Sequence, residues 1–255
     1  MVNDLNDRIA SCARWILQSK RLVVFTGAGI STDSGLPDYR GPEGVWTRRD
    51  KGLPPPVTNI PWSQVKPNAG HMAIYELQET GKLDFLISQN VDNLHLTSGI
   101  RPDMLAELHG NMELVKCVEC NRKFTSKEIG GDASMRGEGY RASTQTGGQT
   151  RCACGGNIVS SVVHFGDPMP EKEMELSIAH SKQCDLFMVV GSSLVVRPAA
   201  DMPLYALTGG AKLVIINKGQ TPFDSEAHLR FWENIGDVLP PVVTRVRAVL
   251  SHAKR

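Results

Sequence analysis

Four of the six cysteines stand in two close pairs, a spacing typical of a metal site. The pairs are Cys117 with Cys120 and Cys152 with Cys154. Four thiolates complete a tetrahedral Zn²⁺ shell and leave no open position for catalysis, so we predict one structural zinc ion. The second pair has one intervening residue where two are usual, and unrelated free thiols are the alternative. The other two cysteines, which lie in apolar contexts typical of inert core thiols, are Cys12 and Cys184.

A glycine-rich turn follows the first strand-length apolar run. Gly27, Ala28 and Gly29 come directly after residues 22–26. Glycines at the end of a strand let the backbone approach a pyrophosphate closely, so we predict a phosphate-binding loop. The full dinucleotide fingerprint is not met, because Thr32 stands where its third glycine would be and no acidic residue ends the second strand. Hydride transfer is therefore not favoured, and a purely structural turn is the alternative.

His109 is the histidine best placed for proton transfer. It follows the apolar stretch 104–108 and precedes Gly110. An ordinary histidine titrates near neutral pH, so one at a strand end facing a cofactor could act as a general base. A capping or packing role is the alternative. For His71 and His95, which fall on helix-like segments, we expect structural hydrogen bonds.

Alternating strand and helix patterns must position these residues. Four buried-strand patterns cover 22–26, 84–88, 185–190 and 212–216. Helical patterns cover 3–20, with Asn3 as the cap candidate, and 68–80, 171–182 and 198–207. This alternation predicts an α/β fold with a Rossmann-like, doubly wound parallel sheet. In such sheets ligands bind beyond the carboxyl ends of the strands, where the polar turns of this chain fall.

Two segments interrupt the alternation and read as insertions. Residues 37–67 are rich in proline and glycine, which predicts a mobile loop rather than a helix or a strand throughout. Residues 111–160 carry the cysteine pairs and predict a small zinc-binding module. The main domain would then comprise residues 1–110 and 161–255. Within the module, we expect residues 130–150 to form a flexible excursion, because they contain almost no large apolar side chain.

Composition excludes several classes of protein. The 255 residues include 28 Lys and Arg against 27 Asp and Glu, so nucleic-acid binding by bulk positive charge is not implied. No apolar run approaches the roughly 18 residues of a membrane span, and the first residues lack a hydrophobic signal core. We therefore expect a cytoplasmic protein that does not cross a membrane. The oligomeric state is unknown, with a monomer as the default.

Taken together, the motifs resemble the sirtuins, which are NAD-dependent protein-lysine deacylases. The matching segments occur in family order from about residue 20 onward: 27–31, 34–40, 89–92, His109 with Gly110, the four paired cysteines, 165–167, 191–194 and Asn217. Residues 41–47 look most like the branch that includes human sirtuins six and seven.

The resemblance implies a set of NAD contacts. Gly27, Ala28 and Arg40 would hold the pyrophosphate. Ser31, Asn90 and Asp92 would line the nicotinamide pocket. Gln89 would bond the ribose. Ser192, Ser193 and Asn217 would grip the adenosine side. The remaining cofactor-binding positions implied are Gly29, Asp38, Tyr39 and Gly191.

The resemblance also implies a reaction. The carbonyl oxygen of an acyl-lysine attacks the ribose carbon as nicotinamide leaves, aided by the catalytic residues Asn90 and Asp92. His109 then removes a proton from a ribose hydroxyl so that the acyl group can transfer to it. Lysine, nicotinamide and O-acyl-ADP-ribose would result. The partners implied are acyl-lysine proteins or peptides, bound as an added strand by Val163, His164, Phe165 and Gly166.

Departures from the family pattern narrow the expected chemistry. Tyr39 replaces the usual phenylalanine, and Asp167 replaces the usual glutamate. The Tyr-x-x-Arg pair of succinyl-removing sirtuins is absent between residues 44 and 68, so we expect acetyl or longer neutral acyl groups. Two other functions remain as alternatives: a protein mono-ADP-ribosyltransferase on the same fold and a non-enzymatic NAD-binding module. The presence of His109 favours the deacylase, because ADP-ribose transfer alone does not need this base.

Overall fold

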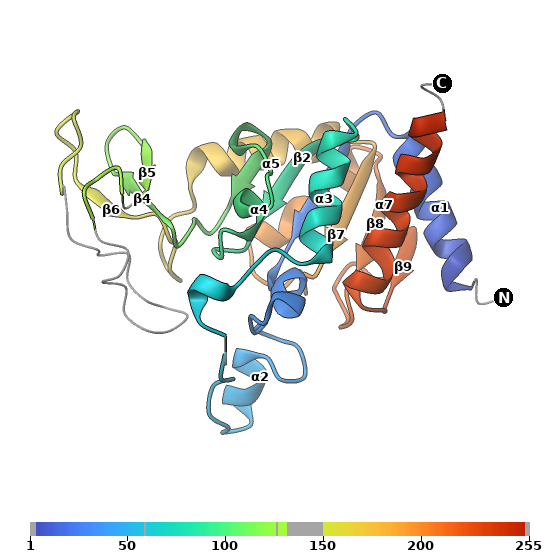
Figure 1. The fold of residues 1–255 in the computed structure, drawn as a ribbon, viewed down its shortest axis with the longest axis horizontal. Helices are drawn as coiled ribbons and strands as arrows, with labels where there is room; N and C mark the ends of the chain where they lie inside the picture. Colours follow the sequence, from blue (N-terminus) through green and yellow to red (C-terminus); the bar gives the residue numbers. More distant parts are fainter. Residues whose placement is uncertain (1–3, 59, 126, 132–149, 253–255) are drawn as a thin grey trace. The chain divides into compact units, whose positions relative to one another are not determined.

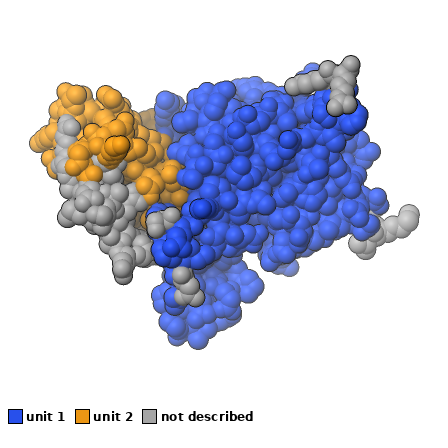
Figure 2. All heavy atoms as spheres, in the orientation of Figure 1, with its two compact units in different colours: residues 1–89, 94–106, 172–255 blue, residues 90–93, 107–171 orange. Residues whose placement is uncertain are grey.

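The computed structural model describes residues 4–58, 60–125, 127–131 and 150–252. The chain divides into two compact units (Figure 2). The first comprises residues 1–89, 94–106 and 172–255, and the second residues 90–93 and 107–171. The predicted module at 111–160 falls inside the second unit, and the predicted domain boundaries stay a prediction.

The first unit is built on a six-stranded sheet (Figure 1). Its order is β3 (Leu105–Glu107), β2 (Leu83–Ser88), β1 (Leu22–Thr26), β7 (Leu186–Val190), β8 (Lys212–Ile216) and β9 (Leu229–Phe231). The pairs of β1 with β2 and β7, of β7 with β8, and of β8 with β9 are all parallel. The chain therefore adds strands outward from β1 on one side and then from β7 on the other. The predicted doubly wound sheet is confirmed, with its switch point between β1 and β7.

Helices cover the sheet because its strands are apolar on both faces. Side chains of α1 (Leu5–Gln18), α3 (Ala69–Glu79) and α7 (Ile235–His252) form one core cluster with alternate strand residues such as Val24 and Met188. α6 (Met202–Thr208) packs on β7 and β8. α5 (Glu171–Gln183) carries His180, whose ring stacks on Phe85 with 4.0 Å between centroids. The short α4 spans Leu94–Thr97.

Three helical segments differ from expectation. The first helix begins at Leu5 with Asp4 as its N-cap residue, and the expected cap Asn3 lies outside the described residues. The loop at 37–67 contains a helix, α2 (Val45–Asp50). The predicted helix 198–207 starts as a 3-10 turn, Ala199–Asp201, before α6. These three differences leave the order of the predicted elements unchanged, whereas α7 and β9 were not predicted.

The second unit contains a small antiparallel sheet in the order β5 (Lys123–Thr125), β4 (Leu114–Cys117), β6 (Ile158–Ser160). Only Val115 and Cys117 of its strand residues are buried. Most of the expected excursion at 130–150 cannot be compared, because residues 132–149 lie outside the described part of the chain. Among the residues described, no helix has the length and apolar character needed to cross a membrane.

Candidate functional site

The loops after β1 and β7 meet backbone to backbone at the carboxyl edge of the sheet. The N–H of Gly29 donates to the carbonyl of Gly191 at 2.8 Å. A Cβ on Gly27 or Gly29 would stand 2.8 or 2.7 Å from that carbonyl oxygen, closer than side chains tolerate. Gly191 has a φ of 68°, which favours glycine. Glycine is therefore required at all three positions, and the edge presents the bare backbone that close approach to a pyrophosphate needs.

Gln89 joins the loop after β2 to the same edge. Its Nε2 donates to Ser192 Oγ at 2.6 Å, and the N–H of Leu194 donates to the same hydroxyl at 3.2 Å. The N–H of Gln89 also donates to the carbonyl of Thr26 at 3.0 Å. Ser193 is half-buried beside this contact. The structure thus brings Gln89 and Ser192 together, so that three loops form one polar edge at the switch point.

Ser31 lies in a 3-10 helix, Ala28–Ser34, which the start of α3 holds in place. Asn68 caps α3, and its Nδ2 donates to the carbonyl of Ile30 at 2.7 Å and to Ser34 Oγ at 3.0 Å. Ser31 is buried, and its Oγ lies 3.5 Å from Nε2 of His71. The position of Ser31 is therefore set by α3 as well as by its own turn.

His71 and His95 form a buried pair behind this turn. Their ring centroids are 5.1 Å apart, and Nε2 of His95 lies 2.9 Å from Thr26 Oγ1. Burial lowers the pKa of His71 to about 4. Burial also lowers the pKa of His95 well below its ordinary value, and the charge of a protonated His71 would lower it further. Both rings are neutral at pH 7, which confirms the expected structural role.

Arg40 is presented by a small aromatic cluster. Its Cζ lies 4.2 Å from the ring centroid of Trp46, and Tyr39 meets the same ring edge-on at 5.5 Å. Asp38 shapes this segment, because its Oδ1 accepts the N–H of Gly41 at 2.9 Å. Burial lowers the pKa of Arg40 from its ordinary value, but an arginine remains charged at pH 7. The segment therefore offers a held guanidinium that suits a phosphate group.

In the second unit, Asn111 anchors the turn that carries His109. Nδ2 of this fully buried residue donates to Glu107 Oε1 at 2.5 Å and to Asn93 Oδ1 at 2.8 Å. Its N–H donates to Ser161 Oγ at 3.1 Å. The half-buried His109 thus lies in a turn between Glu107 and Asn111, whose side chains are joined by a hydrogen bond.

The segment at 90–93 is tied to the same turn. The N–H of Met112 donates to the carbonyl of Val91 at 2.8 Å. Asn90 and Asp92, on either side of Val91, are both buried. Gly110 has a φ of 76°, and a Cβ there would lie 1.9 Å from the carbonyl oxygen of Ser161. The second unit therefore gathers all three predicted catalytic residues on two segments joined by backbone and side-chain hydrogen bonds.

The predicted substrate segment lies beside this turn. The N–H of Val163 donates to the carbonyl of His109 at 3.0 Å, and the N–H of His164 donates to Asp167 Oδ2 at 2.9 Å. Phe165 is 77% exposed, and Gly166 has a φ of 94°. Two N–H groups of this segment are therefore engaged within the chain.

The four paired cysteines form one cluster in the second unit. Their sulfur atoms all lie within 4.8 Å of one another. Sγ of Cys117 is 3.5 Å from Sγ of Cys154, and Sγ of Cys120 is 3.7 Å from Sγ of Cys152. A tetrahedral zinc with bonds of about 2.3 Å would separate its sulfur ligands by about 3.8 Å, so the donor set fits Zn²⁺.

Contacts within the cluster shift the pKa values of two of its thiols in opposite directions. Backbone hydrogen bonding at Cys120, more than any other contact, lowers the pKa of Cys117 to about 7. Although hydrogen bonding to the Gly156 backbone opposes it, contact with the other three thiols raises the pKa of Cys154 to about 12. A bound cation would stabilise the thiolate form of all four cysteines.

A model described as Sir2 family matches residues 56–198, which is more than half of the chain. The chain belongs to the Sir2 family. This membership agrees with the resemblance inferred from its motifs, and it accounts for a parallel sheet with an inserted cysteine cluster.

Relatives of this Sir2 chain cover nearly all of it. It is 39% identical to "NAD-dependent protein deacetylase SRT1" of Arabidopsis thaliana over 88% of the chain, but it spans only 46% of that longer protein. It is 36% identical to "NAD-dependent protein deacetylase 1" of Bradyrhizobium diazoefficiens, covering 95% of the chain and 98% of the relative. A solved Sir2 structure with a deacetylated p53 peptide and 3′-O-acetyl ADP-ribose has a TM-score of 0.70 and 32% identity, covering 92% of this chain and 97% of that one.

Sequence reasoning missed several polar residues of this Sir2 chain. Asn111 and Glu107 flank His109 closely, and a polar residue directly after the histidine motif was the available signal for Asn111. Arg230 binds the carbonyls of Asn217 and Gly219. It carries no such signal, because it stands outside any motif and these two partners follow another strand, β8.

Proposed function

We propose that this chain is an NAD-dependent protein-lysine deacylase that yields nicotinamide and O-acyl-ADP-ribose. The observation that carries the proposal is its similarity, across almost the whole of both chains, to a bacterial protein named as an NAD-dependent deacetylase. The glycine edge of the first unit supports it, because a dinucleotide needs bare backbone at a switch point. Residues 41–47 and the similarity to a relative named Sirt6 support placement in the branch with human sirtuins six and seven.

The first unit would hold the dinucleotide. Gly27, Ala28 and Gly29 bring backbone close to the pyrophosphate, and Arg40 supplies a charged fork beside it. Gly191 keeps the facing loop free of a side chain. Further contacts would come from the polar edge and the shaped turn: Ser31, Asp38, Tyr39, Gln89, Ser192, Ser193 and Asn217. When bound, NAD supplies an activated ribose carbon, and the chain excludes water from it with residues 37–67.

The second unit would supply the proton transfer. His109 would accept, at an imidazole nitrogen, the proton of the ribose hydroxyl to which the acyl group is transferred. Asn90 and Asp92 orient the nicotinamide amide by hydrogen bonds. The hydrogen bond between the side chains of Asn111 and Glu107 would steady the turn that carries His109.

Acyl-lysine peptides would bind along residues 163–166. Because the N–H of Val163 and both the N–H and the carbonyl of His164 are engaged within the chain, a substrate strand would pair with other backbone groups of this segment. Backbone pairing tolerates many sequences. Since no Tyr-x-x-Arg pair is present at 44–68, neutral acyl groups should react faster than succinyl groups on the same peptide. The zinc ion would be structural, because its four thiolate ligands leave no open position.

A screen of acetyl-, myristoyl- and succinyl-lysine versions of one peptide with NAD tests the proposal, with nicotinamide release as the readout. Mass spectrometry of the peptide and of the protein separates a lost acyl group from a gained ADP-ribose. His109→Ala should abolish acyl loss while NAD binding persists. A wild-type protein that releases nicotinamide with no acyl peptide, or that gains ADP-ribose instead, would overturn the deacylase assignment.

A further inference from the structure

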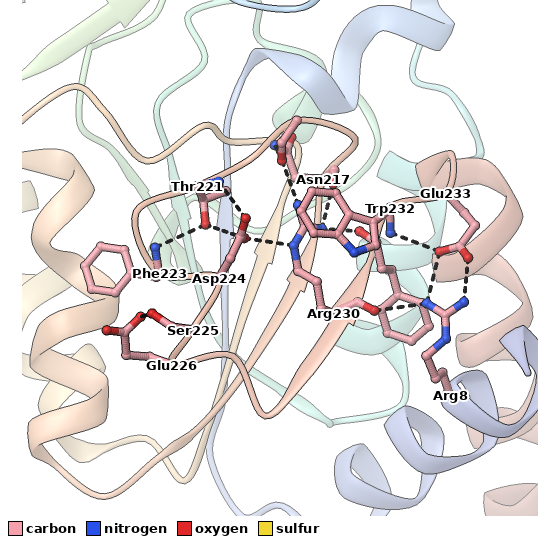
Figure 3. Close-up of polar contacts among 12 residues, drawn as sticks. Arg8, Asn217, Thr221, Phe223, Asp224, Ser225, Glu226, Arg230, Trp232 and Glu233 are labelled. Atoms are coloured by element: carbon pink, nitrogen blue, oxygen red, sulfur yellow. Dashed lines mark hydrogen bonds and ion pairs between the residues drawn. The ribbon is translucent and has the colours of Figure 1, made fainter. Parts of the chain in front are cut away.

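Arg230 of β9 holds the loop that follows β8 (Figure 3). Its Nη1 donates to the carbonyl of Asn217 at 2.6 Å and also to the carbonyl of Phe231. Its Nη2 donates to the carbonyl of Gly219 at 2.6 Å, and its Nε donates to Asp224 Oδ1 at 2.9 Å. One planar side chain therefore binds three carbonyls and one carboxylate around a single turn.

The far end of the loop is tied to the same ion pair. The carboxylate of Asp224 accepts the N–H of Thr221 at 3.0 Å and its hydroxyl at 2.8 Å. Trp232 covers the guanidinium, with 3.6 Å between its ring centroid and Cζ of Arg230 (Figure 3). The course of the chain from Asn217 to Thr221 thus follows the geometry of one guanidinium.

The ion pair between Arg230 and Asp224 is largely buried, so desolvation of the two charges offsets much of the stability that the pair could add. The Arg230 side chain is 11% exposed. Burial lowers its pKa, and the charge of Asp224 works against that lowering. Buried ion pairs add little stability compared with apolar side chains of similar size. We therefore ascribe to this pair an orienting role, because its hydrogen bonds fix the loop backbone in one geometry. The backbone oriented in this way includes the carbonyl of Asn217, which accepts from Arg230.

Asn217 stands at the same edge of the sheet as the glycine loops. Val190 and Ile216 are paired in the parallel register of β7 and β8, and Gly191 and Asn217 directly follow them. Nδ2 of Asn217 donates to the carbonyl of Gly219 at 2.9 Å, the same carbonyl that Arg230 binds. This contact engages the amide nitrogen of Asn217, and the amide oxygen Oδ1 is not part of it. An acceptor there suits the hydroxyl groups of a ribose.

We propose that Arg230 is a positioning residue for NAD, which holds the loop so that Oδ1 of Asn217 accepts from the ribose hydroxyls of the adenosine half. The inference rests on the proposed use of NAD. Arg230 itself touches neither the reacting atoms nor the acyl-lysine. Its loss should therefore weaken the binding of any ligand with this adenosine half and leave the chemical step alone.

Arg230→Lys tests the inference, because lysine keeps the charge but cannot bind three carbonyls and a carboxylate in one plane. We expect the affinity for ADP-ribose, measured by calorimetry, to fall about tenfold, which is the loss of one good charged hydrogen bond. In turnover, KM for NAD should rise by a similar factor, while kcat and KM for the acyl peptide stay within about twofold.

Arg8→Lys is the matched control. Arg8 of α1 also binds a carboxylate through two nitrogens, Glu233 at 2.5 and 3.2 Å, and donates to the carbonyl of Arg230 at 2.9 Å. It stacks on Phe231 rather than on the loop after β8. We expect this variant to lower thermal stability as Arg230→Lys does and to leave ADP-ribose affinity unchanged.

Equal loss of ADP-ribose affinity in both variants, or none in a folded Arg230→Lys protein, would overturn the inference. If Arg230→Lys does not fold, Asp224→Asn carries the test: we expect about a threefold loss of affinity, and an unchanged affinity counts against the positioning role. Calorimetry with ADP-ribose needs no turnover. A wild-type protein without deacylase activity would thus defeat the proposed function and leave this test intact.

Discussion

The strands that precede the glycine loops of the first unit are buried along their whole length, whereas the strands next to the cysteine cluster of the second unit are largely exposed or half-buried. Every residue of β1 and β7 is buried. In β4 only Val115 and Cys117 are buried, and β5 has no buried residue. The strands of the first unit therefore bury much more apolar surface than those of the second unit.

This difference shows two ways of placing reactive groups in one chain. In the first unit, apolar packing fixes the strands, and the absence of side chains at Gly27, Gly29 and Gly191 then decides how closely the loops meet. In the second unit the apolar core is too small to do this alone, so bonds to a metal would supply much of the folding free energy. Substitutions that add atoms to the glycine loops should therefore have the largest effects in the first unit. In the second unit, substitutions that change the metal ligands should have the largest effects.

Gly191→Ala should have the largest effect on this contrast. A Cβ there would lie 2.3 Å from the N of Ile30, at a φ of 68°. We expect the free energy of unfolding to fall by about 3 kcal/mol or more, and NAD binding to be lost, because strain and overlap add. Urea unfolding followed by circular dichroism, with calorimetry for NAD, measures both.

Gly210→Ala is the control for that change. Its φ is 86°, but a Cβ would meet nothing within 4 Å. The left-handed backbone alone should cost about 1 kcal/mol and leave NAD binding intact. Equal costs at the two glycines would mean that backbone conformation, and not the close approach of two loops, sets the requirement at Gly191.

Cys117→Ser should lower stability and soluble yield before it alters the chemistry. Removing one of four thiolates from a structural zinc site should cost about 3 kcal/mol. Zinc content, measured with a chromogenic chelator after denaturation, and the thermal midpoint are the readouts. Cys184→Ser is the control, because burial raises the pKa of Cys184 to about 12 and its Sγ donates to the carbonyl of Ser181. A fully stable, fully active Cys117→Ser protein would contradict a structural zinc.

Acid should weaken the first unit through His71. Its pKa is about 4 in the folded protein and near 6.5 in an unfolded chain. The unfolded state therefore binds more protons, so this contribution to stability is complete above about pH 6.5 and is lost as the pH falls toward 4.

Between pH 7 and pH 5 we expect the free energy of unfolding to drop by about 2 kcal/mol on account of His71. Urea titrations at the two pH values measure it, and His71→Gln should shrink the drop. A His71→Gln protein with the same pH dependence as the wild type would assign the effect to other groups.

Gly156→Ala should have the smallest effect of these substitutions, and it tests whether the geometry around the sulfur ligands controls zinc affinity. A Cβ there would lie 2.6 Å from Sγ of Cys117, so the ligand must shift and zinc affinity should fall about tenfold. Gly155→Ala adds a Cβ in open space at a φ of 91° and should leave zinc affinity nearly unchanged. Competition with a chelator of known affinity ranks the two variants, and the reverse order would mean that the turn, rather than the sulfur geometry, controls binding.

Much of the fold was predictable because buried parallel strands read as continuous apolar runs. The strand 212–216 was predicted with its observed bounds, and 22–26 likewise. α7 was not predicted, since Pro240 and Pro241 each remove a helical hydrogen bond. Burial of Val238, Leu239, Val242, Val243 and Val246 outweighs that cost in the folded chain. Short β9 carries too few residues for its pattern to stand out.

The amino-acid sequence by itself determined which chemistry each segment could do. Thiols at 117, 120, 152 and 154 indicate a metal, and glycines after a buried strand indicate close approach to a phosphate. Only the tertiary structure decided that Gln89 would meet Ser192 and that Arg230 would hold the turn after Asn217. Those contacts depend on strand order and register, which arise from the packing of the whole sheet and leave no mark in the residues around each partner.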